Sequence, residues 1–311
     1  MAAAHARHAS PLERLLLSEA FDGEALVREP MARHTSYRIG GPADLFVRAD
    51  SLCAARQVME ACAEAGVPCM AVGRGTNLLV SDEGFSGVIL TLGRDFKRMA
   101  TDLAAGRITA GGAVLLSAVV QEAMRQELSG LEFAVGTPGT VGGAVRMNAG
   151  SREEWMGSVV SSVVLITAAD GIRRIDAHQI SWEYRRTSIP ADAVIAECEI
   201  SMKESDPFFI RGRMEANMAR RKKSQPLGFP SCGSVFKNPE GASAAKLIDD
   251  LGLKGKTIGG AQVSEVHANF IVNTGGAKAS DVVDLMELVR SEVEKAYGIT
   301  LEPEVRLLGF S

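Results

Sequence analysis

The clearest periodic segment in the first third of the chain is a predicted helix over residues 51–65. Its apolar residues recur every three or four positions, at Leu52, Ala55, Val58, Met59 and Cys62, which is the spacing of one helix face. Ser51 is a suitable N-cap, and Gly66 ends the helix. Short apolar runs predict strands around it, over 45–49, 68–72 and 88–92. Together these elements predict a small α/β unit.

The middle of the chain reads as a sheet and the last third as mixed helix and strand. Strands are predicted over 107–110, 159–167, 172–175 and 194–202, with one helix over about 116–128. The last hundred residues predict helices over about 208–223, 243–251 and 280–297 and a strand over 268–273. The final helix has a single apolar stripe, with Ser280 as its cap and Gly298 as its end.

These elements give an α+β fold class and four parts. We expect an N-terminal arm over 1–19, two α/β subdomains over 20–94 and 95–204, and a C-terminal domain over 205–311. The last boundary is set by the polar stretch Glu204-Ser205-Asp206-Pro207, where the composition changes.

Composition and charge exclude several classes of protein. Hydrophobic residues make up 46% of the 311 residues, which is too many for a disordered chain. The net charge of −4 argues against a general nucleic-acid binder. The five cysteines include no C-x-x-C pair, so we expect neither a metal site nor a disulfide framework. No apolar run approaches membrane-spanning length, so we expect a cytoplasmic protein without membrane insertion.

Two glycine-rich loops, 72–80 and 136–150, follow strand-like segments. Neither contains G-x-G-x-x-G or a Gly-Lys-Ser/Thr sequence, which disfavours a Rossmann site and a Walker loop. Loops with many unhindered backbone N–H groups bind phosphate oxygens. A single Gly-x-Gly would indicate only a tight turn, but two such loops in one chain favour a ligand.

The two loops resemble the FAD-binding region of the vanillyl-alcohol-oxidase/p-cresol-methylhydroxylase superfamily. Three further segments narrow the resemblance to the UDP-N-acetylenolpyruvoylglucosamine reductase family: Tyr184-Arg185, the stretch 233–239 (Gly-Ser-Val-Phe-Lys-Asn-Pro) and the C-terminal stretch 301–306 (Leu-Glu-Pro-Glu-Val-Arg). The resemblance covers about residues 20–310. It implies a two-part FAD-binding α/β region followed by a C-terminal α+β substrate domain.

The resemblance also implies a cofactor and a reaction. NADPH would reduce a bound FAD, which would in turn reduce the enolpyruvyl group of UDP-N-acetylglucosamine enolpyruvate to give UDP-N-acetylmuramate for peptidoglycan and the cell wall. We expect non-covalent FAD, because neither 73–81 nor 136–150 contains the His, Cys or Tyr to which covalent members attach flavin. The implied FAD-binding residues are Gly73, Arg74, Gly75, Thr76, Asn77, Leu78, Gly136, Thr137, Pro138, Gly139, Thr140, Gly142, Gly143, Ala144, Asn148 and Gly150.

Three residues match the catalytic positions of the family. Ser234 matches its proton donor, and Glu304 matches its C-terminal glutamate, which orients or protonates at the reacting end. Arg185 matches an arginine suited to hold the substrate carboxylate and to stabilise enolate charge. The motifs leave two alternatives open: Arg186 in place of Arg185, and Glu302 in place of Glu304.

The resemblance implies five substrate-binding residues: Tyr184, Lys222, Lys237, Asn238 and Asn269. Which of Arg221, Lys222 and Lys223 meets the diphosphate stays open, because cations are also favoured at a helix C-terminus. His267 is as suited to a core role as to a site role. We expect no nucleic-acid partner, and the oligomeric state is open, with a monomer allowed.

Two departures from the family pattern stand out. Ser151-Arg152-Glu153-Glu154-Trp155 replaces the family's Ala-Tyr-Gly after Gly150, close to the expected flavin. No tyrosine lies between Tyr184 and Ser234, so the chain resembles the shorter subtype that lacks an extra tyrosine loop. The alternatives to the family reaction are another flavin oxidase or dehydrogenase acting on an alcohol or lactone, and a nucleotide-sugar binder without activity.

Overall fold

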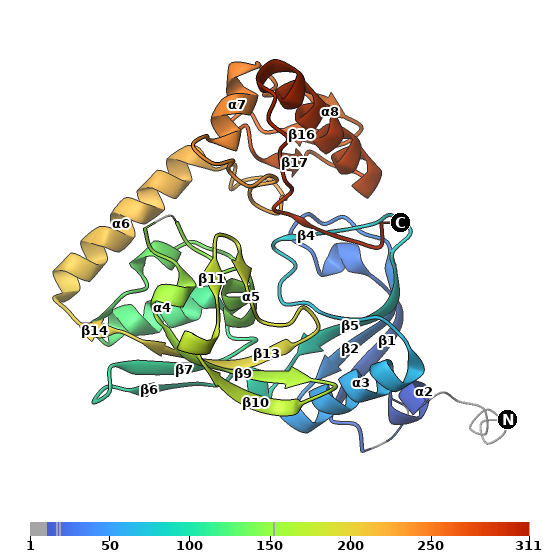
Figure 1. The fold of residues 1–311 in the computed structure, drawn as a ribbon, viewed down its shortest axis with the longest axis vertical. Helices are drawn as coiled ribbons and strands as arrows, with labels where there is room; N and C mark the ends of the chain where they lie inside the picture. Colours follow the sequence, from blue (N-terminus) through green and yellow to red (C-terminus); the bar gives the residue numbers. More distant parts are fainter. Residues whose placement is uncertain (1–10, 17, 19, 152, 311) are drawn as a thin grey trace, which may run out of the picture. The chain divides into compact units, whose positions relative to one another are not determined.

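The computed structural model describes residues 11–310 apart from 17, 19 and 152. The chain forms two compact units, drawn as ribbons in Figure 1. Unit 1 holds the residues up to Val27, Leu45–Gly73 and Gly87–Met218, and unit 2 holds Arg28–Asp44, Arg74–Ser86 and the residues from Ala219 onward. The α+β class is confirmed.

This division differs from the expected one. The two predicted α/β subdomains share unit 1, and two of their segments, 28–44 and 74–86, group with the C-terminal residues instead. The physical reason is long-range pairing, which periodicity does not reveal. Strand β4 (Leu78–Val80) pairs in parallel with β18 (Arg306–Leu308), and the fully buried Tyr37 lies in the core of unit 2. The predicted arm over 1–19 lies largely outside the described residues.

A four-stranded sheet lies mainly in unit 1 and has the order β1-β2-β5-β3. Its strands are β1 (Gly23–Pro30), β2 (Pro42–Ala49), β5 (Phe85–Leu92) and β3 (Cys69–Ala71), the last two paired in parallel. Helix α3 (Leu52–Ala65) packs on this sheet through Ala55, Val58, Met59 and Cys62 of the predicted stripe, whereas Leu52 is exposed. Ser51 caps its start, and Gly66 is in the left-handed conformation at its end. The short helix α2 (Pro11–Leu16) precedes it.

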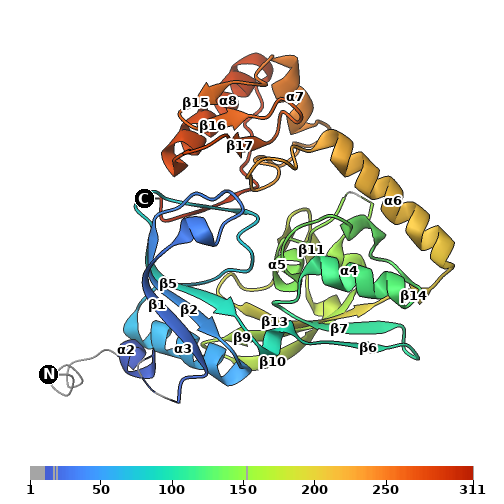
Figure 2. The ribbon, with the colours of Figure 1, turned by 180° about the vertical axis from the view of Figure 1, so that it is seen from behind.

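A five-stranded antiparallel sheet completes unit 1, in the order β10-β9-β13-β7-β6. The strands are β6 (Met99–Asp102), β7 (Arg107–Gly111), β9 (Val160–Thr167), β10 (Gly171–Asp176) and β13 (Val194–Ser201). Helices α4 (Leu116–Arg125) and α5 (Val141–Arg146) lie on one face of this sheet, as both ribbon views show (Figure 2). Residues of β9 and β13 also join the core under α3, so the two sheets of unit 1 share a core.

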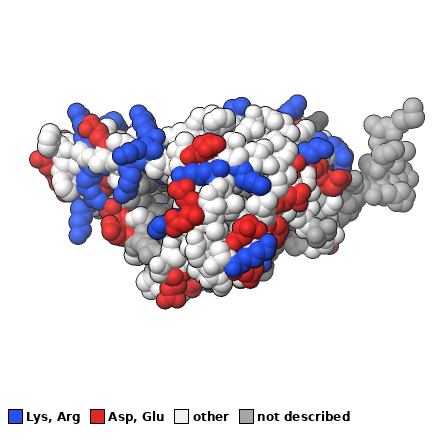
Figure 3. Space-filling view, turned by 90° about the horizontal axis from the view of Figure 1, so that it is seen from above, with Lys and Arg blue, Asp and Glu red and all other residues white. Residues whose placement is uncertain are grey.

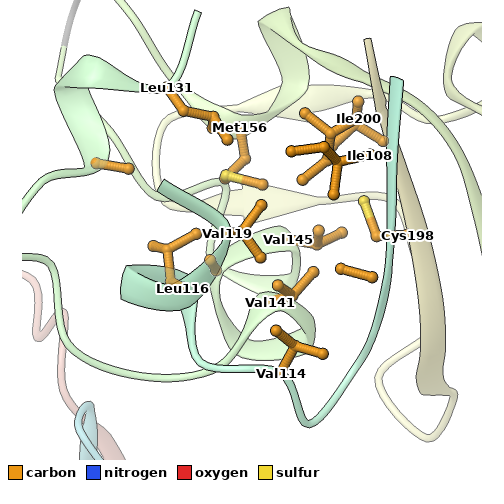
Figure 4. Close-up of a cluster of buried hydrophobic side chains, with 14 of the residues drawn as sticks. Ile108, Val114, Leu116, Val119, Leu131, Val141, Val145, Met156, Cys198 and Ile200 are labelled. Atoms are coloured by element: carbon orange, nitrogen blue, oxygen red, sulfur yellow. The ribbon is translucent and has the colours of Figure 1, made fainter. Parts of the chain in front are cut away.

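The core between α4, α5 and the sheet is drawn in Figure 4. Fully buried side chains from both helices, the sheet and the preceding loops meet there: Ile108, Leu116, Val119, Leu131, Val141, Val145, Met156, Cys198 and Ile200. Short elements connect this region: β8 (Leu128–Ser129), β11 (Trp182–Glu183), β12 (Arg186–Thr187), β14 (Lys203–Glu204), η2 (Asp95–Lys97), η3 (Glu132–Ala134), η4 (Met156–Ser158) and η5 (Ala177–Gln179).

Unit 2 has its own core. It contains η1 (Met31–Arg33), α7 (Ala244–Asp250), α8 (Ala279–Tyr297), the strand pair β4 and β18, and a small sheet of β15 (Thr257–Ile258), β16 (Ala261–Val263) and β17 (Ile271–Asn273). The apolar stripe predicted for the last helix is buried at Val282, Leu285, Met286, Val289 and Val293, and its last member, Ala296, is exposed. Helix α6 (Pro207–Ser224) begins in unit 1 and ends in unit 2.

Several boundaries differ from the sequence predictions for identifiable reasons. The predicted helix over 116–128 ends at Arg125, because Glu127 adopts a left-handed φ of 58° before β8. Ser280 is not the cap of α8. The helix starts at Ala279, and the Asp82 carboxylate accepts the N–H groups of Ala279 and Ser280 instead. The strand predicted from 268 begins at Ile271, because a turn through Asn269 precedes it.

Strand β1 was not predicted. None of its residues is buried, and it forms the edge of its sheet. An edge strand with few buried positions lacks the alternation from which strands are recognised.

Gly212 offers a test of the local stability of α6. It is exposed in the helix interior, has no positive φ, and a Cβ there would meet no atom within 4 Å. We therefore expect Gly212→Ala to raise the free energy of unfolding by roughly 0.5–1 kcal/mol, since glycine is disfavoured in helices by about that amount. Urea denaturation measures the change. Gly171→Ala is the matched control, because Gly171 has a φ of 69° and should lose stability; a Gly212→Ala midpoint at or below wild type would contradict the expectation.

Candidate active site

The two predicted flavin loops meet inside unit 1 at Gly73 and Thr140. A Cβ at Gly73 would lie 2.6 Å from the Thr140 Oγ1, so only glycine fits there without movement. The Thr140 hydroxyl also accepts the N–H of Gly143 at 3.3 Å and caps α5. The close packing therefore fixes the start of the first loop against the turn of the second.

Several N–H groups of these loops are available to an anion. Among the described residues of unit 1, the N–H groups of Gly73, Gly136, Gly139 and Thr140 donate to no protein acceptor. Gly136 and Gly139 have positive φ values of 70° and 113°, which residues with a Cβ rarely adopt. Gly142 differs, because its N–H donates to the Gly112 carbonyl at 3.0 Å and the residue serves close packing. This donor set fits the diphosphate of a dinucleotide such as FAD.

The end of the second loop is tied to the Tyr184-Arg185 turn. Asn148 accepts the N–H of Gly157 and donates its amide to the Glu183 carbonyl, each at 2.9 Å. The Arg185 Nη1 donates to the Gly150 carbonyl at 2.9 Å. A Cβ at Gly150 would clash with the backbone of Glu154 and Trp155. Two family motifs that lie thirty-five residues apart in sequence are thus joined in unit 1.

Arg185 is held in an unusual backbone conformation. It follows Tyr184 in the two-residue turn between β11 and β12, and its φ is 58°, a left-handed value that non-glycine residues rarely adopt. Its guanidinium carbon lies 5.0 Å from the centre of the Tyr184 ring, within cation–π range. Strain of this kind concentrates at functional sites, because it fixes the direction of a side chain.

Ser234 and Glu304 lie on adjacent segments of unit 2. Phe236 and Pro303 form an isolated antiparallel bridge, and the Glu304 N–H donates to the Val235 carbonyl at 2.7 Å. Since Ser234 immediately precedes Val235, the structure brings together two residues that are seventy positions apart in sequence. Both are half-buried, so each can reach a ligand.

Two asparagines brace this pair of segments. The Asn269 carboxamide is bound at both ends by Phe236, accepting its N–H at 3.0 Å and donating to its carbonyl at 2.8 Å. Asn77 donates to the Glu304 carbonyl at 3.1 Å, and its own carbonyl accepts the Arg306 N–H. The geometry gives both side chains a positioning role. Their expected contacts with substrate and FAD, respectively, stay predictions.

Neutral buried groups lie behind Ser234 and Glu304. Burial, with a contribution from the Glu304 charge, raises the pKa of the Cys232 thiol to about 12. Burial likewise raises the pKa of Tyr37, whose hydroxyl donates to the Ile271 carbonyl at 2.9 Å. Both groups therefore stay protonated at neutral pH. Neither residue was expected at the site from sequence, although Tyr37 lies in the segment 35–43, which also resembles the family.

His267 has a structural role. Its Nδ1 accepts the Asn269 N–H at 3.2 Å, and its ring packs edge-on against Phe270. Burial lowers the pKa of His267, so the neutral imidazole is favoured at physiological pH.

The other expected substrate residues occupy varied surroundings. The Lys237 Nζ pairs with Glu302 at 3.1 Å, and the Asn238 Oδ1 accepts the Ala244 N–H at the start of α7. Lys222 is exposed in the last turn of α6, while burial lowers the pKa of the half-buried Arg221 next to it. Which of these cations meets a diphosphate stays a prediction.

Acidic and basic side chains are interspersed over much of the face shown in Figure 3. On α7 and α8 they form pairs along one helix, such as Lys246 with Asp250 and Arg290 with Glu287. This mixture fits the modest net charge of the chain.

Comparisons with known proteins find family models that match two separate stretches of the chain. Residues 43–175 match a family model described as an FAD binding domain, and residues 225–308 match one described as the C-terminal domain of UDP-N-acetylenolpyruvoylglucosamine reductase. A reductase of that name from Heliobacterium modesticaldum is 45% identical over 293 residues, covering 94% of this chain and 93% of its own. The chain belongs to the UDP-N-acetylenolpyruvoylglucosamine reductase family.

Other relatives give the same family. The reductase 2 of Symbiobacterium thermophilum is 42% identical, with 96% of this chain and 97% of that protein covered. The crystal structure of the Thermus caldophilus reductase matches with a TM-score of 0.79 and 34% identity over 92% of this chain and 98% of that one.

Membership of this family confirms several sequence predictions. The chain is an oxidoreductase that uses FAD, with NADPH as the reductant, and its fold combines an FAD-binding region with a C-terminal domain. Among the described residues, no helix is long and apolar enough to cross a membrane. The roles of individual site residues are not decided by these likenesses.

Proposed function

We propose that the chain reduces the enolpyruvyl group of UDP-N-acetylglucosamine enolpyruvate to give UDP-N-acetylmuramate for peptidoglycan synthesis. The glycine-rich loops would hold FAD, which would supply hydride transfer between NADPH and the methylene carbon of the enolpyruvyl group. The protein must then stabilise negative charge at the neighbouring carbon and supply a proton to it.

We assign charge stabilisation to Arg185. A guanidinium can bind the substrate carboxylate with two parallel hydrogen bonds and stabilise the enolate charge that develops there. The left-handed turn at Arg185 and its bond to the Gly150 carbonyl support this role, because both limit where the side chain can lie before substrate binds.

We assign proton transfer to Ser234, with Glu304 orienting the reacting end. Serine is a weak acid, so it serves only where it is held beside a strongly basic carbon. The hydrogen bond from the Glu304 N–H to the Val235 carbonyl is the observation that carries this proposal, since it holds the two segments side by side. The buried neutral groups behind them, Cys232 and Tyr37, add no competing charge.

We also propose that the enzyme works in the cytoplasm. All five cysteines are free thiols, and Cys62, Cys198 and Cys232 are buried. Unpaired cysteines are typical of a reducing compartment.

The decisive assay is the oxidation of NADPH by the purified protein with and without the enolpyruvyl UDP-sugar. We expect sustained oxidation only when this substrate is present, with formation of an equal amount of UDP-N-acetylmuramate. Reduction of the bound flavin by an alcohol or a lactone in the absence of NADPH would instead favour another flavin oxidase or dehydrogenase. Binding of the UDP-sugar without any oxidation would leave only a binding protein.

A further inference from the structure

The segment that departs from the family pattern is tied to helix α6. The Glu154 Oε1 accepts a close hydrogen bond from the Arg213 Nη2, and the same guanidinium reaches the Glu132 Oε2 through Nη1 at 3.4 Å. All three residues belong to unit 1. Glu154 is therefore an acidic anchor point between the segment after Gly150 and α6.

This ion pair differs from an ordinary surface pair. The side chains of Arg213 and Glu154 are only 33% and 35% exposed, and that of Glu132 is 1% exposed. Fully exposed ion pairs contribute little to stability. An ion pair that also contacts a buried carboxylate is screened less by water and salt. The Glu132 Oε1 has no hydrogen-bond partner among the described residues, so Arg213 supplies the compensating charge for this group.

Arg213 is itself held in place by its helix. Its guanidinium lies 5.7 Å from the centre of the Phe209 ring, one turn earlier. One turn later, Asn217 donates to the Glu132 carbonyl at 3.0 Å. The anchor is therefore part of a packed helix face.

The contacts continue from Glu154 to Arg185. The Glu154 carbonyl accepts the Ser151 N–H at 2.7 Å, and Gly150 and Trp155 form an antiparallel bridge. These contacts close the 150–155 loop into a tight turn. The turn directs the Gly150 carbonyl toward the Arg185 Nη1, which it binds at 2.9 Å.

We propose that Glu154 is a positioning residue for Arg185: by binding Arg213 it fixes the 150–155 loop, and through the Gly150 carbonyl it sets the position of the guanidinium that binds the substrate carboxylate. The inference rests on the proposed role of Arg185. It assigns a function to the segment in which this chain departs from its family, and it makes α6 a support for the site.

The test is a double-mutant cycle between Glu154 and Arg185. Glu154→Ala should lower kcat/KM for the enolpyruvyl substrate about 10-fold, because a small misplacement of a substrate-binding group has a large effect on rate. In the Arg185→Ala background the same change should have less than about a two-fold effect, since coupled residues are not additive. Glu154→Gln keeps an acceptor oxygen and should lose less. Glu153→Ala is the matched control, because Glu153 is the exposed neighbour in the same loop.

A readout that does not depend on activity is hydrogen–deuterium exchange of the 149–157 segment. Its amides should exchange faster in Glu154→Ala than in wild type or Glu153→Ala, while those of the α4 core should not change. Full kcat/KM in Glu154→Ala, or an equal loss with and without Arg185, would overturn the inference while the role of Arg185 stands. If Arg185→Ala is itself fully active, the proposed role of Arg185 falls and the inference falls with it.

Discussion

Ser234→Ala should slow the reduction of the enolpyruvyl substrate by about 10²–10⁴-fold, the usual effect of losing a general acid. The oxidation of NADPH by the enzyme needs no proton from this residue, so its rate should stay near wild type. Stopped-flow absorbance resolves the two half-reactions. Alanine removes one oxygen and little volume from a half-buried position, so FAD content and thermal stability should change little.

Two further variants separate this role from a structural one. Ser234→Cys should recover part of the lost rate, because a thiol with a pKa of about 8.5 in model peptides is a stronger acid than a hydroxyl. Ser231→Ala, in the same loop, is the matched control and should leave both half-reactions unchanged. If Ser234→Ala slowed both half-reactions equally, or neither, Ser234 would be a structural residue and not the proton donor.

Arg185→Ala should lower the rate of substrate reduction by about 10²–10³-fold, the range observed when a group that stabilises developing negative charge is removed. Arg185→Lys should recover only part of this loss, since an ammonium cannot offer two parallel hydrogen bonds to a carboxylate. NADPH oxidation should again be spared. Substrate affinity should also fall, and equilibrium titration of the oxidised enzyme measures it.

Arg186→Ala is the control for Arg185. Arg186 is exposed in β12, paired with Glu183, and it was the alternative that the Tyr-Arg motif left open. We expect this variant to keep nearly full activity. A large loss in Arg186→Ala together with an active Arg185→Ala would reverse the assignment of the two arginines.

Much of the fold could be predicted from local patterns. The apolar stripes of α3 and α8, the apolar run of β9 and the alternation in β13 are visible in sequence, because each element buries one face or both faces in a core. The motifs also pointed to the family and its cofactor, and the family models confirm both.

What could not be predicted depends on pairing between distant segments. The parallel pair of β4 and β18 joins residues more than two hundred positions apart, and the Asp82 cap of α8 is equally remote. Glu154 and Arg213 also pair across a long stretch of sequence, and no motif or regular spacing links them. Asn269 was expected at the substrate, but the fold uses its carboxamide to hold the Phe236 backbone, a role that sequence does not distinguish from ligand binding.

The most direct test of the account is a single turnover without oxygen. The holoenzyme is first reduced with one equivalent of NADPH and then mixed with the enolpyruvyl UDP-sugar. We expect the visible flavin absorbance to return in full, with one UDP-N-acetylmuramate formed for each enzyme-bound FAD. If the reduced enzyme stays reduced after this mixing and returns to its oxidised spectrum only with oxygen or another acceptor, the proposed reaction is wrong.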